Sequence, residues 1–487
     1  MSIRRTKIVA TLGPATNNPE SLERIIKAGV DVVRLNFSHG DAEDHRKRAE
    51  MVREIAAKNG RHVGILVDLQ GPKIRIARFR NNKVVLQRGA PFTLDINLPS
   101  EDGDETQVGI SYPQLARDVK PGDVLMLDDG RVELGVDRVD NGKVHCHVRV
   151  GGDLSNNKGI NLQGGGLSAA ALTEKDKADI KTAVQIDADY VAVSFPRSAA
   201  DIEEARQLLR DAGAADGAIG IVAKIERAEA IEMPVIEEII KASDVIMVAR
   251  GDLGVEIGDA RLPGVQKDLI SRARALHRVV ITATQMMESM IQSPLPTRAE
   301  VCDVANAVFD GTDAVMLSAE TASGQYPDKA VEAMHRVCLE AEAHFRVRGP
   351  AQWRSETDFQ HIDEAIAMAT MYAANHLKVK AIASLTVSGS TPLHMSRPSS
   401  GIPIFALTPH EKTCTRVSLF RGVTPLTFPM ETTDHFALNR AVIDEFLRLG
   451  LVTSDDDLVI LTKGDLEGVR GGTNAMKIVR VGDVRSR

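Results

Sequence analysis

Charged side chains gather at the ends of two apolar segments of this sequence. The segment VAKIE places Lys224 and Glu226 two residues apart, and the next apolar run ends in ARGDLG, where Asp252 follows on a Gly-flanked turn. Residues two apart in a strand point to one face, so Lys224 and Glu226 would lie together. An isolated Lys-Glu pair is more often a structural ion pair. Two carboxylates from neighbouring strand ends nevertheless suit Mg²⁺, and we predict a magnesium site at Glu226 and Asp252.

A second polar group ends the segment VVRLNFS. Arg34, Asn36 and Ser38 alternate with apolar residues, which turns one cation and two oxygen donors to a single face of a strand. For Arg34 alone, a solvated strand end is an equally good interpretation.

Hydroxyl groups mark two later segments. Thr282 and Thr284 lie in ITATQ, and Ser318 and Glu320 lie in MLSAET. Taken singly, such threonines and serines more often bond to the backbone than take part in catalysis. Gathered with the cations and carboxylates above around one mouth, they indicate phosphoryl transfer, which depends on positioning and charge neutralisation.

The segments that carry these residues follow one repeating pattern. A short Val/Ile-rich run, a polar turn and an amphipathic stretch recur, which is typical of βα units. Asn18 and Pro19 are expected to begin the first helix, and Gly29 to end it. Eight strands are predicted, in KIVATLG, VDVVRLNFS, HVGILVDLQ, YVAVSF, IGIVAKIE, VIMVARG, VVITATQ and AVMLSAE.

This pattern predicts an α/β fold with three units. Residues 1–71 and 170–345 match the roughly 250 residues of a (β/α)8 TIM barrel, whose active site lies at the carboxyl ends of the strands. Residues 72–169 are expected to form an inserted all-β lid, a β-barrel domain with hairpin signals at Asp129-Gly130, Asn141-Gly142 and Gly151-Gly152.

The remaining residues, 346–487, are expected to form a C-terminal α/β regulatory domain. It would follow a linker near Pro350 that contains the only Trp. Its strands are predicted in AIASLTV, IPIFALT, DLVILTK and MKIVRVG.

Composition limits the partners. The 487 residues carry a formal net charge of −7, which disfavours nucleic acid and anionic membranes. No apolar run reaches the ~18–20 residues of a membrane span. The four cysteines contain no C-x-x-C pair, so neither a disulfide framework nor a structural zinc site is indicated. We expect a soluble cytoplasmic protein that binds neither nucleic acid nor membrane.

Whole phrases of the sequence resemble the pyruvate kinase family, in its bacterial form. They run in order across residues 6–327: TKIVATLGPAT, VVRLNFSHG, DLQGPKIR, NNKGINLQG, VAKIE, VARGDLGVE, ITATQMMESM, PTRAEVCDVANAVFDGTDAVMLSAETA and SGQYP. The resemblance implies transfer of a phosphoryl group from phosphoenolpyruvate to ADP, giving pyruvate and ATP in the final step of glycolysis. It also implies Mg²⁺ as cofactor, with Mn²⁺ as an alternative.

The resemblance also implies roles for individual residues. Arg34 would grip the substrate phosphate, Lys224 would stabilise the transferring group, and Ser318 would belong to the relay that protonates the enolate. Gly251, Asp252 and Thr284 would line the pocket for the substrate carboxylate. The nucleotide-contacting positions are Thr11, Pro14, Asn36, His39, Arg75 and Lys158.

One motif departs from many members of the family. Those members hold K⁺ at positions that match Asn36, Ser38, Asp68 and Leu69, and carry Thr-Lys-Gly-Pro-Glu where this chain has Leu69-Gln70-Gly71-Pro72-Lys73. The ammonium group of Lys73 would supply the charge of the ion, so we predict an enzyme that works without K⁺.

A hydroxyl-rich loop in the C-terminal part resembles the family's allosteric phosphate loop. It contains Thr386, Ser388, Gly389, Ser390 and Thr391. Such a segment alone is more often only a turn. The resemblance implies a sugar-phosphate or nucleotide effector and a homotetramer. The segment EGVRGGTN, with Arg470, could contribute to the effector site, but its sequence carries little specific signal.

Two alternatives remain at this point. A magnesium-dependent lyase or aldolase acting on a pyruvate enolate would also use a Glu/Asp metal pair, but it would not need the inserted lid. A non-catalytic metabolite sensor would not need Lys224, Glu226 and Asp252. The tripeptide Arg250-Gly251-Asp252 also matches an adhesion signal, which we interpret as a chance match.

Overall fold

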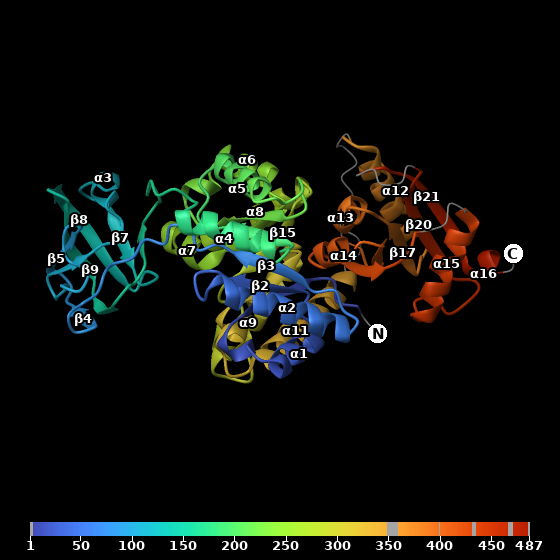
Figure 1. Ribbon diagram of the computed structural model, residues 1–487, viewed down its shortest axis with the longest axis horizontal. Coiled ribbons are helices and arrows are strands. Elements are labelled where there is room, and N and C mark those ends of the chain that lie inside the picture. The colour runs from blue at the N-terminus through green and yellow to red at the C-terminus, as the bar shows by residue number, and fades with distance from the viewer. Residues whose placement is uncertain (1–2, 348–358, 399, 431–434, 466–470, 486–487) are drawn as a thin grey trace.

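The computed structural model describes residues 3–347, 359–398, 400–430, 435–465 and 471–485. Three units lie in a row, with the barrel in the middle, the inserted unit at one end and the C-terminal unit at the other (Figure 1). The expected linker with Pro350 and the Trp, and Arg470 in the C-terminal unit, lie outside the described residues. Within these ranges, no helix is long and apolar enough to cross a membrane.

The central unit is a closed barrel of eight parallel strands, as the sequence predicts. Neighbouring strands follow the order β1-β16-β15-β14-β13-β12-β3-β2. The strands are β1 (Lys7–Leu12), β2 (Val32–Asn36), β3 (Gly64–Asp68), β12 (Tyr190–Val193), β13 (Gly220–Ile225), β14 (Val245–Ala249), β15 (Val279–Ala283) and β16 (Ala314–Leu317). Their side chains are almost all buried, because helices cover the outside and the interior is filled.

Helices alternate with these strands. They are α1 (Pro19–Ala28), α2 (Ala42–Lys58), α4 (Glu174–Gln185), α5 (Ala199–Asp211), α6 (Val235–Ala242), α7 (Arg250–Ile257), α8 (Leu262–Ala275), α9 (Arg298–Asp310), α10 (Ala319–Ala322) and α11 (Pro327–Val347). Asn18 caps α1 through Ser21, and Gly29 ends that helix, both as expected.

An aspartate stands immediately before every second strand. Asp31, Asp189, Asp244 and Asp313 precede β2, β12, β14 and β16, and each carboxylate accepts a hydrogen bond from a backbone N–H of the preceding strand, at 2.7–3.0 Å. Each aspartate therefore joins two strands at the end of the barrel opposite the mouth.

The inserted unit leaves the barrel after β3, as predicted. Its strands are β4 (Lys83–Leu86), β5 (Pro91–Asp95), β6 (Gln107–Gly109), β7 (Val124–Leu127), β8 (Val132–Asp140), β9 (Lys143–Val150), β10 (Gly152–Ser155) and β11 (Ile160–Leu162), with one short helix, α3 (Leu115–Asp118).

The hydrogen bonding of this unit differs from the prediction in two respects. Its strands form a six-stranded and a two-stranded sheet, rather than one closed barrel. Turns at Asp129-Gly130 and Asn141-Gly142 do join antiparallel neighbours. Gly151-Gly152 does not make a hairpin, because β10 pairs with the distant β4.

The C-terminal unit is a five-stranded sheet with order β19-β18-β17-β20-β21. Its elements are α12 (Ile362–His376), β17 (Ala381–Leu385), α13 (Ser390–Ser396), β18 (Ile404–Thr408), α14 (Glu411–Val417), β19 (Val423–Thr427), α15 (His435–Arg448), β20 (Leu458–Gly464), β21 (Thr473–Arg480) and α16 (Val481–Arg485). The four predicted strands are present, and β19 is an additional edge strand.

Cations of this unit meet the aspartates at the base of the barrel. Arg397 makes two hydrogen bonds with Asp313, at 2.5 and 3.0 Å, and both side chains are buried. Lys412 lies 3.3 Å from Asp189, and Arg416 lies 3.5 Å from Asp244. The C-terminal unit is therefore attached at the end of the barrel away from the mouth.

Candidate active site

Lys224 is the centre of a buried polar cluster at the carboxyl end of the barrel. Its ammonium nitrogen lies 3.0 Å from Glu226 and 3.2 Å from Asp68. It also donates a hydrogen bond to the hydroxyl of Ser194, at 2.7 Å. The prediction that Lys224 and Glu226 share a face is confirmed. Although burial opposes the charge, the two carboxylates raise the pKa of Lys224, so it stays an ammonium ion.

Arg34 joins this cluster from β2. Its guanidinium donates to Asp68 at 2.6 Å and to the hydroxyl of Thr11 at 3.1 Å. Burial would raise the pKa of Asp68, but Lys224 and Arg34 outweigh burial and lower it. Asp68 is thus an ionised residue that fixes two cations side by side. A pair of held cations is a ready anchor for an anionic substrate.

The two predicted magnesium ligands lie on neighbouring elements. Glu226 is buried and accepts a hydrogen bond from the backbone of Phe195, at 2.7 Å. Burial, with the nearby charge of Asp252, raises the pKa of Glu226 to about 7. Burial and a second carboxylate disfavour the charge of this carboxyl group, and a divalent cation would stabilise it. The donor set therefore fits Mg²⁺. Asp252 lies in the first turn of helix α7, rather than on a free turn as expected.

Thr284 has an unusual backbone. Its φ is +70°, which is rare for a β-branched residue. Its hydroxyl accepts a hydrogen bond from the N–H of Gly251, at 2.8 Å, so two of the three predicted carboxylate-pocket residues are in contact.

Arg250 holds Thr284 in this conformation. The buried guanidinium donates to the carbonyl of Thr284 at 2.7 Å, to that of Ala283 at 3.2 Å, and to Asp303 at 2.8 Å. Sequence reasoning assigned no role to Arg250 and considered it only as part of a chance tripeptide match. Its position two residues before the predicted metal ligand Asp252 was the available clue.

Ser194 was also missed. It receives the hydrogen bond from Lys224 and donates to the carbonyl of Leu69, at 2.7 Å. The available signal was its place after the apolar run YVAV, at the carboxyl end of β12.

The hydroxyls at the last two strands separate into two kinds. Ser318 follows β16 at the mouth, where its N–H donates to the buried Glu320, at 2.7 Å. Thr282 is fully buried and pairs with Thr312 at 2.9 Å. Thr282 is therefore a core residue, with a structural rather than a catalytic role.

The expected nucleotide positions are spread over the mouth and the inserted unit. Thr11 is buried beneath Arg34, whereas Pro14 and His39 are exposed in the segments that follow β1 and β2, and the N–H of His39 donates to the carbonyl of Asn36. Arg75 and Lys158 lie on adjacent segments, since Arg75 pairs with Gly159. Lys158 makes an ion pair with Asp128, at 2.8 Å.

The four expected monovalent-cation positions lie together, whereas Lys73 lies apart from them. Asn36 is the register partner of Asp68, while the side chain of Asn36 bonds to the N–H of Ser38, at 3.1 Å. Leu69 is buried beside them. Lys73 is exposed and lines a small cleft between the inserted unit and the barrel, together with Asp252 and Arg227.

The expected effector loop lies between β17 and α13. Thr386 accepts a hydrogen bond from the N–H of Gly389, and Thr391 pairs with Thr473. Ser390 donates to the buried carboxylate of Asp363, at 2.7 Å, and Ser388 is half-buried. The loop is thus held by one internal hydrogen bond and by bonds to Asp363 and Thr473.

Fold and site together define a barrel phosphotransferase. Residues 3–331 match the family described as "Pyruvate kinase, barrel domain", and residues 364–479 match "Pyruvate kinase, alpha/beta domain". The chain belongs to the pyruvate kinase family.

Relatives match along almost the whole chain. Pyruvate kinase II of Salmonella typhimurium is 58% identical over 481 residues, covering 98% of this chain and 99% of that protein. A pyruvate kinase of Haemophilus influenzae is 56% identical over 464 residues, covering 95% and 96%. A pyruvate kinase of Sporosarcina psychrophila is 41% identical over 487 residues, covering 100% and 82%.

Proposed function

We propose that this enzyme transfers the phosphoryl group of phosphoenolpyruvate to ADP, giving pyruvate and ATP as the final step of glycolysis in the cytoplasm. The observation that carries the proposal is the contact set of Lys224 with Asp68, Glu226 and Ser194 at the barrel mouth. The proposed units are residues 1–71 with 170–345, residues 72–169 and residues 346–487.

The substrate would be held by the paired cations. Arg34 binds the phosphate, and Lys224 neutralises the charge of the group in flight. The N–H of Gly251 and the hydroxyl of Thr284 orient the carboxylate, with Asp252 beside them. Ser318 belongs to the relay that delivers a proton to the enolate.

Glu226 and Asp252 would hold Mg²⁺, or Mn²⁺ in its place. When bound, the ion neutralises phosphate oxygens and orients them for transfer. Thr11, Pro14, Asn36, His39, Arg75 and Lys158 would receive the nucleotide. The inserted unit would then close over the mouth and exclude water, which competes with ADP for the phosphoryl group.

Lys73 would make the reaction independent of K⁺, as its Leu-Gln-Gly-Pro-Lys motif suggests. Its ammonium group replaces the positive charge that K⁺ would bring to Asn36, Ser38, Asp68 and Leu69. In the present arrangement Lys73 lines the cleft with Asp252 instead, so this role requires closure of the inserted unit.

The C-terminal unit would regulate activity in a homotetramer. A sugar phosphate or a nucleotide would bind the loop of Thr386, Ser388, Gly389, Ser390 and Thr391. The carboxylate of Asp363 beside Ser390 would then face the incoming anion, so binding requires the loop to rearrange.

The test is the rate of pyruvate formation from phosphoenolpyruvate, ADP and Mg²⁺ in K⁺-free buffer, with phosphoenolpyruvate varied. We expect robust turnover there, and a Lys73→Glu variant that regains turnover only when K⁺ is added. Lys83→Glu, which changes an exposed lysine on β4 of the inserted unit, is the matched control. Turnover of the unmodified enzyme only with K⁺ would keep the reaction and overturn the role of Lys73. No turnover in either buffer would overturn the reaction.

A further inference from the structure

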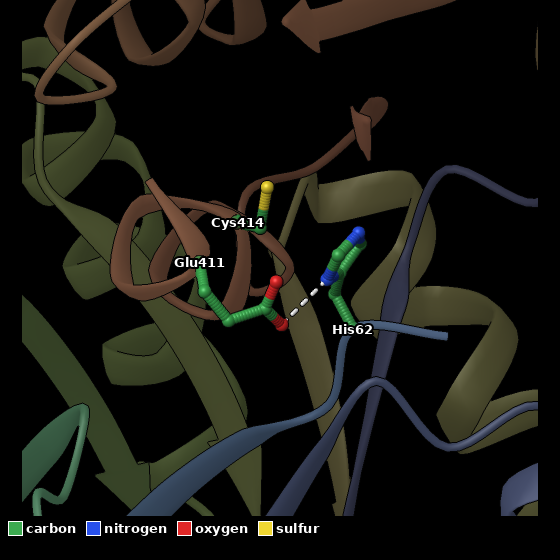
Figure 2. A group of neighbouring side chains, drawn as sticks. All are labelled: His62, Glu411 and Cys414. Atoms are coloured by element: carbon green, nitrogen blue, oxygen red, sulfur yellow. Dashed lines mark hydrogen bonds and ion pairs between the residues drawn. The ribbon is translucent and has the colours of Figure 1, made fainter. Parts of the chain in front are cut away.

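A second group of ligand-type side chains lies at the end of the barrel away from the mouth. It consists of His62, in the segment that enters β3, and of Glu411 and Cys414 on α14 of the C-terminal unit (Figure 2). One ligand atom from each residue lies within 4.8 Å of the other two. The spacing in sequence gave no sign of this group, because its members come from two distant segments.

We propose that His62, Glu411 and Cys414 form a site for one thiophilic divalent cation, for which Zn²⁺ is the best match. The donors are one imidazole nitrogen, one sulfur and one carboxylate oxygen, and Zn²⁺ accepts all three. Mg²⁺ and K⁺ prefer oxygen donors alone, so this site is chemically distinct from the one at Glu226 and Asp252. A water molecule would complete a tetrahedron.

The placement of the three residues favours coordination. Glu411 and Cys414 are three residues apart on one helix and therefore project from neighbouring positions on its surface. Cys414 is buried, whereas the side chain of Glu411 is 67% exposed. The site is thus anchored inside the protein and open on one side, which gives an ion a path of entry.

Thr427 lies close to two of the three proposed ligands. Its hydroxyl lies 3.3 Å from Nε2 of His62 and 3.9 Å from the sulfur of Cys414. The other ring nitrogen, Nδ1, lies 2.8 Å from Glu411. A ligating histidine commonly has its second nitrogen held by a hydrogen bond, and here Thr427 can hold Nε2 while Nδ1 faces the ion.

Binding exchanges a proton for the metal. The S–H bond of Cys414 breaks, the Zn–S bond forms, and the proton leaves to solvent, while neutral His62 and ionised Glu411 bind without further loss. The hydrogen bond between His62 and Glu411 is replaced by two metal bonds. The ion would then tie the entrance of β3 to α14 and so cross-link the two units, whatever reaction the mouth carries out.

The probe is Co²⁺, added to the full-length enzyme with Mg²⁺ in excess to fill oxygen-only sites. We expect a thiolate-to-cobalt charge-transfer band in the near ultraviolet, saturating at one ion per chain and abolished by competing Zn²⁺. Cys414→Ser should lose the band, whereas Cys302→Ser, which changes an exposed cysteine on α9, should keep it.

Two further variants test the other ligands. His62→Gln and Glu411→Gln should each weaken Zn²⁺ competition by about tenfold or more. Glu411 is exposed, so its variant keeps the fold, which circular dichroism would check. The proposal is overturned by a band that survives in Cys414→Ser, by a band lost in Cys302→Ser, by unchanged Zn²⁺ competition in both glutamine variants, or by no band at millimolar Co²⁺.

Discussion

At the scale of single residues, the site consists of charges that hold one another in place. Asp68 contacts both Arg34 and Lys224, so one buried carboxylate sets the distance between two cations. The two-residue spacing of Lys224 and Glu226 was enough to predict that they meet. The positions of Ser194 and Arg250 at strand ends could be read from the sequence, but their hydrogen bonds could not, because the partners lie far away in the chain.

Lys224 is predicted to act in the reaction rather than only in the fold. Lys224→Met should lower kcat by roughly 10²–10³-fold, the loss typical of removing one group that stabilises developing charge. Steady-state rates with varied phosphoenolpyruvate would measure this. Lys241→Met, which removes an exposed lysine paired with Glu237, is the control and should keep its rate. Equal rates for both variants would contradict the role of Lys224.

Arg250 is predicted to position Thr284. Arg250→Lys keeps the charge but cannot reach the carbonyls of Ala283 and Thr284 and the carboxylate of Asp303 together. We expect kcat/KM for phosphoenolpyruvate to fall by about 10–100-fold, because a small misplacement of a binding group is costly. Mg²⁺ affinity, measured separately, should change little. A loss confined to Mg²⁺ affinity would assign Arg250 to the metal site instead.

At the scale of elements, strand prediction succeeded where the pattern was apolar and failed at an edge. The eight barrel strands are buried and rich in Val and Ile, so their signal is strong. Strand β19 is VTPLT, with Pro425 at its centre and largely half-exposed side chains. Proline in a strand normally argues against one, and it is tolerated here because β19 lies at the edge of its sheet.

Gly71 tests the connection between the barrel and the inserted unit, because it lies where the chain leaves β3. Its φ is +66°, and an added Cβ would lie 2.7 Å from the Cβ of Ser194. Gly71→Ala should lower the free energy of unfolding by roughly 2–4 kcal/mol, from backbone strain and overpacking together. Urea denaturation would measure it.

Gly60 is the matched control for Gly71. Its φ is +61°, and nothing lies within 4 Å of an added Cβ. Gly60→Ala should therefore cost only about 1 kcal/mol. Equal losses of unfolding free energy in the two variants would show that backbone conformation alone determines the loss, and that contact with Ser194 is unimportant.

At the scale of the whole molecule, three units in a row meet at two different kinds of junction. The inserted unit borders a small cleft at the mouth, whereas the C-terminal unit is joined to the barrel by ion pairs, of which Arg397–Asp313 is buried. Sequence patterning predicted the order of the units. It also predicted that the inserted unit leaves after the third strand, but it did not predict the ion pairs of the C-terminal unit, because charged residues before strands look like ordinary solvated turns.

The Arg397–Asp313 pair is predicted to hold the C-terminal unit on the barrel. Arg397→Met leaves Asp313 buried without its main cation, which should cost about 3–5 kcal/mol. Calorimetry should then resolve two unfolding transitions. Arg485→Met, which breaks an exposed pair with Asp455, should change stability by less than about 1 kcal/mol. A single, unshifted transition in Arg397→Met would contradict this role.

The four aspartates at the base give the barrel two unlike rims. An aspartate contact recurs at every second strand of the lower rim, while the upper rim carries varied polar side chains, among them Arg34, Lys224 and Thr284. Closure of the barrel and chemistry at its mouth thus draw on separate sets of residues. Substitutions at the upper rim alone can therefore change the reaction during evolution, while the aspartates of the lower rim continue to join the strands.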